Sequence, residues 1–468
     1  MYNETDNILN SNNEYGTKSG TYIKVLLYSL LLSVALSYAH VRSNRLMIWI
    51  IISLFLITPI IVKRELFLPF VLFFLPWSPV MKATPSDFSG FTYIIPVMLL
   101  LFIIPDRNVK KIIVSLKLIL IVLLITMLTL FSKLLFGHSI AMNYIAFMAM
   151  LILLPLFLAS YKDFISFEWC TYFLFFGIVS SCIAASVLLQ YPHMNEFISI
   201  FENVLTEITR KRGFYPDSNF YSAQIALAIG CLLTILSKKS GKQIIVILGM
   251  LIILVYYGFL SVSKSFLITL ICMLVVWAIL IIGSSRMQQK LVILLCVGVC
   301  AVFVITSNIF SDYINMYLTR FTEIDSSGSI TTGRVKLWYA YIDYLSNDYF
   351  SLLFGQGYTS SASILVNGVP RASHNIFIQA IYQLGLFGTV LLIAWINQFR
   401  RLVFSTNKTD MTNDNNDMKT KISRKPFIII LFISMLQWLS LDMLFVDSFF
   451  YTISLVIMGI TYLSRQDV

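Results

Sequence analysis

The feature that most constrains the fold of this chain is a series of long apolar runs that recur from near its N-terminus to near its C-terminus. A transmembrane helix needs about 20 consecutive, mostly apolar residues, and about fourteen runs approach this length. They cover residues 23–39, 46–62, 66–80, 91–105, 112–135, 142–160, 169–189, 218–236, 244–262, 265–283, 290–307, 374–398, 427–441 and 444–463. The sequence therefore predicts an all-α integral membrane protein with about 12–14 transmembrane helices, since a membrane barrel would show short alternating strands instead.

The composition agrees with a membrane location. Of the 468 residues, 58% are hydrophobic and 12% are charged, whereas soluble domains carry about 25% charged residues. Two of the runs contain Pro69, Pro76 and Pro96, so we expect them to be kinked, broken or buried against other helices. Asp442 interrupts the last long apolar stretch, which leaves the boundary between the final two spans open.

The net charge of +11 does not indicate nucleic acid in a chain of this class. Basic residues of membrane proteins act as orientation signals, or they line a cavity for anionic lipid head groups. The six cysteines all fall in apolar runs, so we expect no structural disulfide and no thiolate metal site. No cofactor is predicted.

Orientation follows from the basic residues of alternate loops, which the positive-inside rule places in the cytoplasm. Such residues cluster near positions 63–64, 107–111, 238–242, 286–290 and 400–425, whereas the basic loop 40–45 falls on the outer side against the trend. Both termini are then cytoplasmic, and two long polar loops, 190–218 and 308–373, lie on the outer face. The resulting organisation is a disordered cytoplasmic tail (1–22), a transmembrane bundle of about eleven spans (23–307), a large outer loop (308–373) and C-terminal spans (374–463) with a cytoplasmic linker (399–426).

His374 is the first candidate for chemistry, because it lies where the large polar loop meets an apolar run. A neutral imidazole is a suitable general base near neutral pH. The alternative is a histidine that caps a helix or lies at the membrane interface. Its neighbours favour chemistry: Arg371 and Asn375 are adjacent, and Gly385 and Gly388 would allow close helix approach.

Arginines on the outer loops form the second candidate group. Arg210 belongs to the stretch RKRGFYPDSN, and Arg334 belongs to TTGRVKLW in the other loop. Guanidinium groups bind phosphate oxygens in a bidentate fork, so two such loops beside a histidine favour a diphosphate site. The alternative interpretation of any single arginine is a solvated charge on a loop. For Lys264, in a short outer turn, the alternative is a side chain that snorkels to the membrane interface.

Several other site classes find no support. Carboxylates are nearly absent from the apolar runs, which argues against a proton-coupled transporter. The sequence also has no outward carboxylate pair for a divalent metal, no Ser-His-Asp order, no phosphate-binding glycine loop with lysine, and no His/Cys set with metal-ligand spacing.

At these residues the chain resembles the bacterial O-antigen ligase and O-antigen polymerase superfamily. His374-Asn375, nine further residues and then Gly385-Leu386-Phe387-Gly388 are similar to the family's HN-x9-GxxG pattern. The stretch 210–219 is similar to the family's arginine-bearing motif that opens a span, and Lys264 stands where the family commonly has arginine. The likeness covers roughly residues 210–388.

The resemblance implies a GT-C-like glycosyltransferase bundle in the bacterial inner membrane, with a large periplasmic loop over the site. The implied reaction is metal-independent glycosyl transfer from a glycan linked to undecaprenyl diphosphate. His374 would accept the proton of the acceptor hydroxyl, and Arg210 and Arg334 would hold the diphosphate. The remaining substrate-binding candidates are Asn219, Lys264, Arg371 and Asn375.

Three functions remain in competition. The favoured one is an O-antigen or similar surface-polysaccharide polymerase, which moves the growing chain onto the next lipid-linked repeat unit. The second is an O-antigen ligase, which transfers the chain to the lipid A-core. The third, from another class, is a lipid-linked oligosaccharide flippase or transporter. The expected partners are the undecaprenyl-diphosphate-linked oligosaccharide and membrane lipid, with a chain-length regulator protein left open and nucleic acid not expected.

Overall fold

The structure is a computed structural model of the chain. It describes residues 2–104, 113–138, 142–198, 210–282, 311–322, 334–357, 363–366, 368–404, 425–442, 444 and 447–464.

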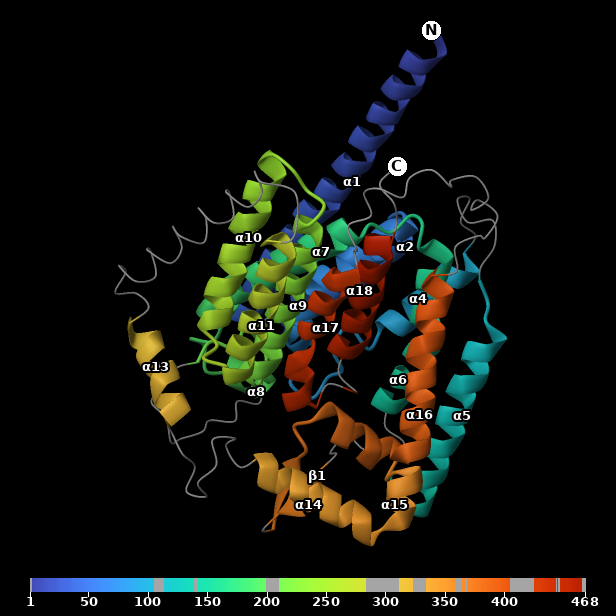
Figure 1. Cartoon of the computed structure of the whole chain (residues 1–468), viewed down its shortest axis with the longest axis vertical. Helices are drawn as coiled ribbons and strands as arrows, with labels where there is room; N and C mark the ends of the chain where they lie inside the picture. Colours follow the sequence, from blue (N-terminus) through green and yellow to red (C-terminus); the bar gives the residue numbers. More distant parts are fainter. Residues whose placement is uncertain are drawn as a thin grey trace.

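Long helices make up the body of the molecule (Figure 1). Among the described residues, seven helices are long and apolar enough to cross a membrane: Ser19–Val41 of α1 (Tyr2–Val41), α5 (Leu116–Leu135), Tyr144–Tyr161 of α6 (Met142–Tyr161), α7 (Phe167–Leu188), α9 (Ser218–Leu236), α10 (Lys242–Phe259) and α16 (Ile376–Phe404). Shorter apolar helices accompany them: α2 (Arg45–Ile61), α4 (Ile94–Ile103), α11 (Lys264–Ile282), α17 (Lys425–Ile433) followed by η5 (Leu436–Ser440), and α18 (Asp447–Ser464). A multi-pass, mostly helical membrane protein is thus confirmed, while the count of about 12–14 spans stays a prediction, since the run 290–307 lies outside the described residues.

The third predicted span is broken. After the short η1 (Arg64–Leu66), α3 (Phe67–Phe74) changes into the 3₁₀ helix η2 (Leu75–Val80), which contains Pro76 and Pro79. Every residue of α3 is fully buried. Gly177 of α7 permits this, because a Cβ there would lie 2.1 Å from the Phe73 carbonyl oxygen. A small residue at the contact lets the two backbones approach closely.

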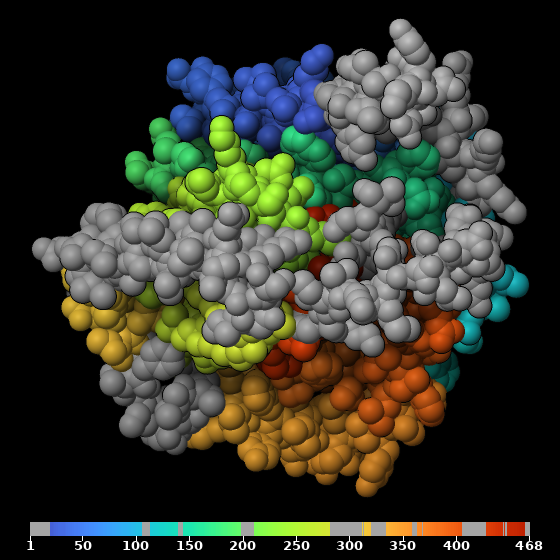
Figure 2. Space-filling view, turned by 45° about the horizontal axis from the view of Figure 1, so that its top comes forward, coloured from blue at the N-terminus to red at the C-terminus, as the bar shows by residue number. Residues whose placement is uncertain are grey.

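The predicted large outer loop is folded rather than irregular. It contains α13 (Ser311–Thr322), α14 (Arg334–Asn347), α15 (Tyr349–Phe354) and an antiparallel hairpin of β1 (Ser363–Val366) and β2 (Val369–Ala372). The segment of α14, α15 and the hairpin lies at the end of the molecule opposite to both termini (Figure 1). In Figure 2 its orange residues form a continuous region along the lower edge, beside α16. The other predicted outer loop contains the short helix α8 (Met194–Ile198).

A backbone contact holds this segment on α16. Gly385 interrupts α16 with φ +68, and Gly355, directly after α15, has φ +76. A Cβ on Gly385 would lie 2.3 Å from the Leu353 carbonyl oxygen, so the two chains touch through bare backbone. The Gln356 N–H donates to the Tyr382 carbonyl at 2.8 Å, which fixes the contact. Gly385 was predicted to allow close approach, and here it also breaks the helix.

Two predicted segments and the predicted fold class differ from the structure. The segment 1–22, predicted to be a disordered tail, is helical from Tyr2 as the start of α1. The linker, predicted to begin at 399, begins only after Phe404, because α16 continues to that residue; positions 405–424 lie outside the described residues. The all-α class needs one addition, the hairpin of β1 and β2.

Candidate functional site

His374 lies in the three-residue connection between β2 and α16. Its backbone has φ +48, a left-handed conformation that is uncommon for a residue with a Cβ. Asn375 follows, and its side-chain oxygen accepts hydrogen bonds from the N–H groups of Phe377 (2.9 Å) and Ile378 (3.2 Å). Asn375 therefore caps the first turn of α16, and the left-handed backbone of His374 turns the chain between β2 and α16.

Asp442, which lies 68 positions after His374 in the sequence, holds the connection 373–375 through hydrogen bonds. Its Oδ1 accepts from the Ser373 hydroxyl at 2.6 Å, and its Oδ2 accepts from the His374 backbone N–H at 3.0 Å. The same Oδ2 lies 3.4 Å from His374 Nδ1, an ion-pair distance that is longer than a full hydrogen bond. The His374 side chain is 41% exposed and that of Asp442 is 17% exposed. The carboxylate thus fixes the backbone and faces the inner nitrogen of an imidazole whose remaining surface is accessible.

A break in the last apolar stretch places Asp442 next to His374. Helix α17 gives way to η5, which ends at Ser440, and α18 begins only at Asp447. Between them the Leu444 N–H donates to Gln379 Oε1 of α16 at 3.1 Å. The interruption that Asp442 causes in the sequence is therefore a structural break beside the start of α16.

Helix α14, which begins at Arg334, packs on the residues that lead into His374. Trp338 Nε1 donates to the Ser373 carbonyl at 3.0 Å, and the Tyr341 hydroxyl donates to the Arg371 carbonyl at 2.9 Å. Arg334 precedes Trp338 by four residues and Tyr341 by seven, so all three lie on one face of α14. Since α14 runs antiparallel to residues 371–373, Trp338 and Tyr341 hold it against the end of the hairpin that leads into His374.

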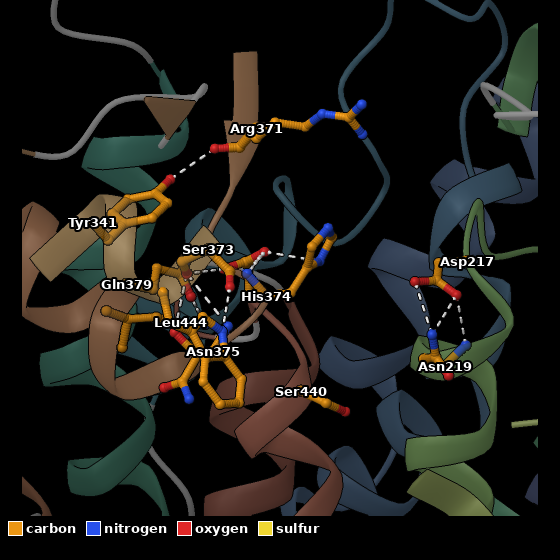
Figure 3. Close-up of polar contacts among 12 residues, drawn as sticks. Asp217, Asn219, Tyr341, Arg371, Ser373, His374, Asn375, Gln379, Ser440 and Leu444 are labelled. Carbon is orange, nitrogen blue, oxygen red and sulfur yellow. Dashed lines mark hydrogen bonds and ion pairs between the residues drawn. The ribbon is translucent and has the colours of Figure 1, made fainter. Parts of the chain in front are cut away.

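The electrostatics around this face are mixed. Burial raises the pKa of the Tyr341 hydroxyl above its ordinary value, and the neighbouring Asp442 carboxylate raises it further. Arg371 is exposed on β2, and in Figure 3 its guanidinium extends to the same side as the His374 imidazole. The site therefore presents an imidazole backed by a carboxylate, with the exposed Arg371 three residues before the histidine.

The remaining predicted residues form a second group around the start of α9. Asn219 donates from Nδ2 to both oxygens of Asp217, at 2.9 and 3.1 Å, and its Oδ1 accepts from Ser263 at 2.7 Å. Arg210 Nε donates to the Ser261 carbonyl at 3.0 Å. Lys264 opens α11 next to this turn. The hydrogen bonds of Asn219 are structural, because they tie the 210–219 loop to the α10–α11 connection.

A short bridge joins the two groups. The Ser222 hydroxyl of α9, one turn after Asn219, donates to Gln437 Oε1 of η5 at 3.2 Å. Gln437 precedes Asp442 by five residues, and five residues span at most about 18 Å. Figure 3 shows Asp217 and Asn219 across from His374. The structure thus places His374, Asn375 and Arg371 around the start of α16 and Arg334 at the start of α14, and it places Arg210, Asn219 and Lys264 around the starts of α9 and α11. Their roles in binding and catalysis stay predictions.

The sequence reasoning missed the partners of His374. Ser373 and Asp442 surround it, although no Ser-His-Asp order was recognised. The hydroxyl of Ser373 donates to the carboxylate and not to the imidazole, so this is a brace for the histidine and not a nucleophilic triad. The available signal was the carboxylate itself, since an ionisable residue that interrupts an apolar run marks a functional candidate.

Comparison with known proteins adds one match. Residues 225–393 match a family model described as O-Antigen ligase. No curated protein and no solved structure matches the chain. The matched range includes Lys264, Arg334, Arg371 and His374, whereas Arg210, Asn219 and Asp442 lie outside it.

Proposed function

Because residues 225–393 are a domain of the O-antigen ligase and polymerase family, we propose that this multi-pass membrane protein is a surface-polysaccharide polymerase. It transfers the growing glycan from undecaprenyl diphosphate onto a lipid-linked repeat unit at the periplasmic face. Family membership carries the substrate class, lipid-linked glycans used in surface polysaccharide assembly. The single structural observation in support is the His374–Asp442 pair, in which the carboxylate lies 3.4 Å from Nδ1 of an imidazole that is 41% exposed.

The proposed reaction begins at the imidazole. With its Nδ1 proton toward Asp442, His374 presents the lone pair of Nε2 outward, where it accepts the proton of the acceptor sugar hydroxyl. The hydroxyl oxygen bonds to the anomeric carbon of the donor glycan. The bond from that carbon to the diphosphate oxygen breaks, and undecaprenyl diphosphate leaves. Asp442 stabilises the imidazolium that forms, as a carboxylate does for a general-base histidine.

Arginines supply the positive charge in this proposal. The diphosphate gains negative charge as the glycosidic bond breaks, and guanidinium groups placed beforehand stabilise that charge more in the transition state than in the ground state. Arg334 and Arg210 have this role, with Arg371 and Lys264 as further contacts, so the transfer is proposed to be metal-independent. The polyprenyl tail remains in the bilayer along the lipid-facing side chains of the spans.

Ligation to the lipid A-core is the second candidate, favoured by the description of the matched family model. Both functions use the same donor and differ in the acceptor. Deleting the gene and separating the surface polysaccharide by gel electrophoresis distinguishes them. A core that carries one repeat unit indicates a lost polymerase, whereas a bare core with full-length chains held on the carrier lipid indicates a lost ligase. Unchanged surface polysaccharide would refute both functions.

A further inference from the structure

The peptide group that joins Ser373 to His374 is held from two sides. Its carbonyl accepts a hydrogen bond from Trp338 Nε1 of α14 at 3.0 Å, and its N–H donates to Asp442 Oδ2 at 3.0 Å. The C=O and N–H of a trans peptide point in opposite directions. A helix of the large outer loop and the connection between η5 and α18 therefore hold the same peptide group from opposite sides.

The backbone at this peptide group is strained. His374 has φ +48, a left-handed value that a residue with a Cβ adopts at a cost in energy. A rotation of the peptide plane by ~180° would carry this φ to about −130, in the extended region that any residue adopts. The same rotation would turn the carbonyl away from Trp338 and the N–H away from Asp442. The two hydrogen bonds therefore oppose a rotation that would relieve the strain.

The carbonyl of this peptide group depends on Trp338. Within the part of the chain that the structure describes, the indole N–H is the single donor to the Ser373 carbonyl. Ser373 is 2% exposed, so water does not readily replace a lost donor. A buried acceptor without a partner costs more free energy than a typical hydrogen bond contributes. Loss of the indole N–H would thus remove one of the two contacts that oppose the rotation.

Helix α14 has other contacts that keep it docked. Leu337, Tyr341 and Leu345 follow one another at intervals of four residues and pack in a small apolar cluster. The Tyr341 ring meets the ring of Tyr382 of α16 edge-on, with centroids 5.3 Å apart. Trp338 is not among the described residues of this cluster. Its hydrogen bond therefore acts on the peptide group before His374 more than on the docking of the helix.

We propose that Trp338 is a positioning residue for the general base, whose indole N–H fixes the 373–374 peptide group in the orientation that pairs His374 with Asp442. Asp442 Oδ2 accepts from the His374 N–H and also lies 3.4 Å from His374 Nδ1. Rotation of the peptide group would therefore move the imidazole relative to its counter-charge. The inference rests on the proposed function, because it requires His374 to accept the proton of the acceptor hydroxyl.

The test separates the hydrogen bond from packing by comparing Trp338→His with Trp338→Phe. Histidine has a ring nitrogen at nearly the same distance from Cβ as indole Nε1, and it can donate, whereas phenylalanine has no donor. The hydrogen bond ranks histidine as the milder change, and packing ranks phenylalanine as the milder one. Tyr341→Phe is the matched control, because it removes a donor of the same helix to the Arg371 carbonyl, two residues before Ser373 (Figure 3).

Two measurements report on the full-length protein in lipid nanodiscs. In single-turnover glycan transfer, Trp338→Phe should lower kcat about tenfold and Trp338→His about threefold or less, with Kd for undecaprenyl diphosphate unchanged in both. Tyr341→Phe should lower kcat about twofold or less. Hydrogen–deuterium exchange of the peptide that contains His374 should accelerate in Trp338→Phe and change less in Trp338→His, because its N–H is released from Asp442. Thermal unfolding reports whether each variant is folded.

A Trp338→Phe protein that keeps more than half of the parent kcat would overturn the inference, as would a greater loss in Trp338→His or unchanged exchange at His374 in Trp338→Phe. Should these variants fail to fold, Trp338→Gln and Trp338→Met replace them, since the two side chains are similar in length and only glutamine donates. Equal or better transfer by the methionine variant then refutes the inference. A parent protein without glycan transfer would remove the proposed function, whereas accelerated exchange in Trp338→Phe would still show that Trp338 holds the peptide group.

Discussion

Replacing Asp442 with asparagine tests the brace behind the proposed general base. Asparagine has nearly the same shape, so it can still accept from the Ser373 hydroxyl or the His374 N–H, which Asp442 contacts at 2.6 and 3.0 Å. The change removes the negative charge that faces His374 Nδ1 at 3.4 Å. The imidazolium formed on proton transfer then loses its counter-charge.

The magnitude follows from the distance and the exposure. Two unit charges 3.4 Å apart interact by about 5 kcal/mol at an effective dielectric constant of ~20 and by about 1 kcal/mol in water. The His374 side chain is 41% exposed and that of Asp442 is 17% exposed, so solvent screening places the interaction energy between these two limits, at about 3 kcal/mol. Since the charge pair exists only after proton transfer, the loss falls on the transition state and lowers kcat about 100-fold.

The assay is single-turnover glycan transfer by purified protein in lipid nanodiscs, with a lipid-linked repeat unit as substrate. Ser373→Ala is the matched control, because it removes a neutral donor to the same carboxylate and leaves the charge in place. That variant should lose only about tenfold or less, the usual weight of one hydrogen bond. An Asp442→Asn protein that keeps more than half of the parent kcat would refute the role assigned to the carboxylate.

Two further changes probe the arginines and the backbone contact. Arg334→Ala should raise Kd for undecaprenyl diphosphate at least about tenfold, because charge-assisted hydrogen bonds contribute about 1.5–3 kcal/mol, whereas Arg42→Ala in the exposed α1–α2 turn should not change it. Equal effects at both positions would show that overall charge alone matters. Gly385→Ala should lower the thermal unfolding midpoint strongly, since its Cβ would lie 2.3 Å from the Leu353 carbonyl oxygen. Gly137→Ala, with φ +67 and no atom within 4 Å of the added Cβ, should cost only about 1–2 kcal/mol, and similar unfolding midpoints for the two variants would contradict the contact.

The fold was predictable where the information is local. Apolar runs of bilayer length identify helices one at a time, and Pro69 and Pro76 predicted a third span that is kinked, broken or buried against other helices. The structure shows a span that is both broken and buried. The order within the outer loop was not predictable, because α14, α15 and the hairpin owe their positions to side chains such as Trp338, which bonds to a residue 35 positions away. A polar stretch between spans gives no periodic signal for such docking.

The site was predictable in part for the same reason. His374 and its neighbours Arg371 and Asn375 form one short motif, so the sequence alone identified them. Asp442 was predicted only to interrupt an apolar run, because its separation of 68 positions from His374 conceals the pairing. Asn219 and Asn375 are predicted to bind substrate, and in the structure Asn219 bonds to Asp217 and Ser263 while Asn375 caps α16. Polar side chains at the ends of helices serve such structural roles routinely, and a sequence does not separate the two uses.

The most direct test of the whole account is the rate of glycan transfer by His374→Ala protein that inserts and folds as the parent does. The account predicts a loss of at least about 100-fold in single-turnover transfer from undecaprenyl diphosphate, with Kd for the lipid nearly unchanged, because the imidazole acts on the acceptor hydroxyl and not on the diphosphate. Transfer at the parent rate by this variant would contradict the central claim that His374 is the general base.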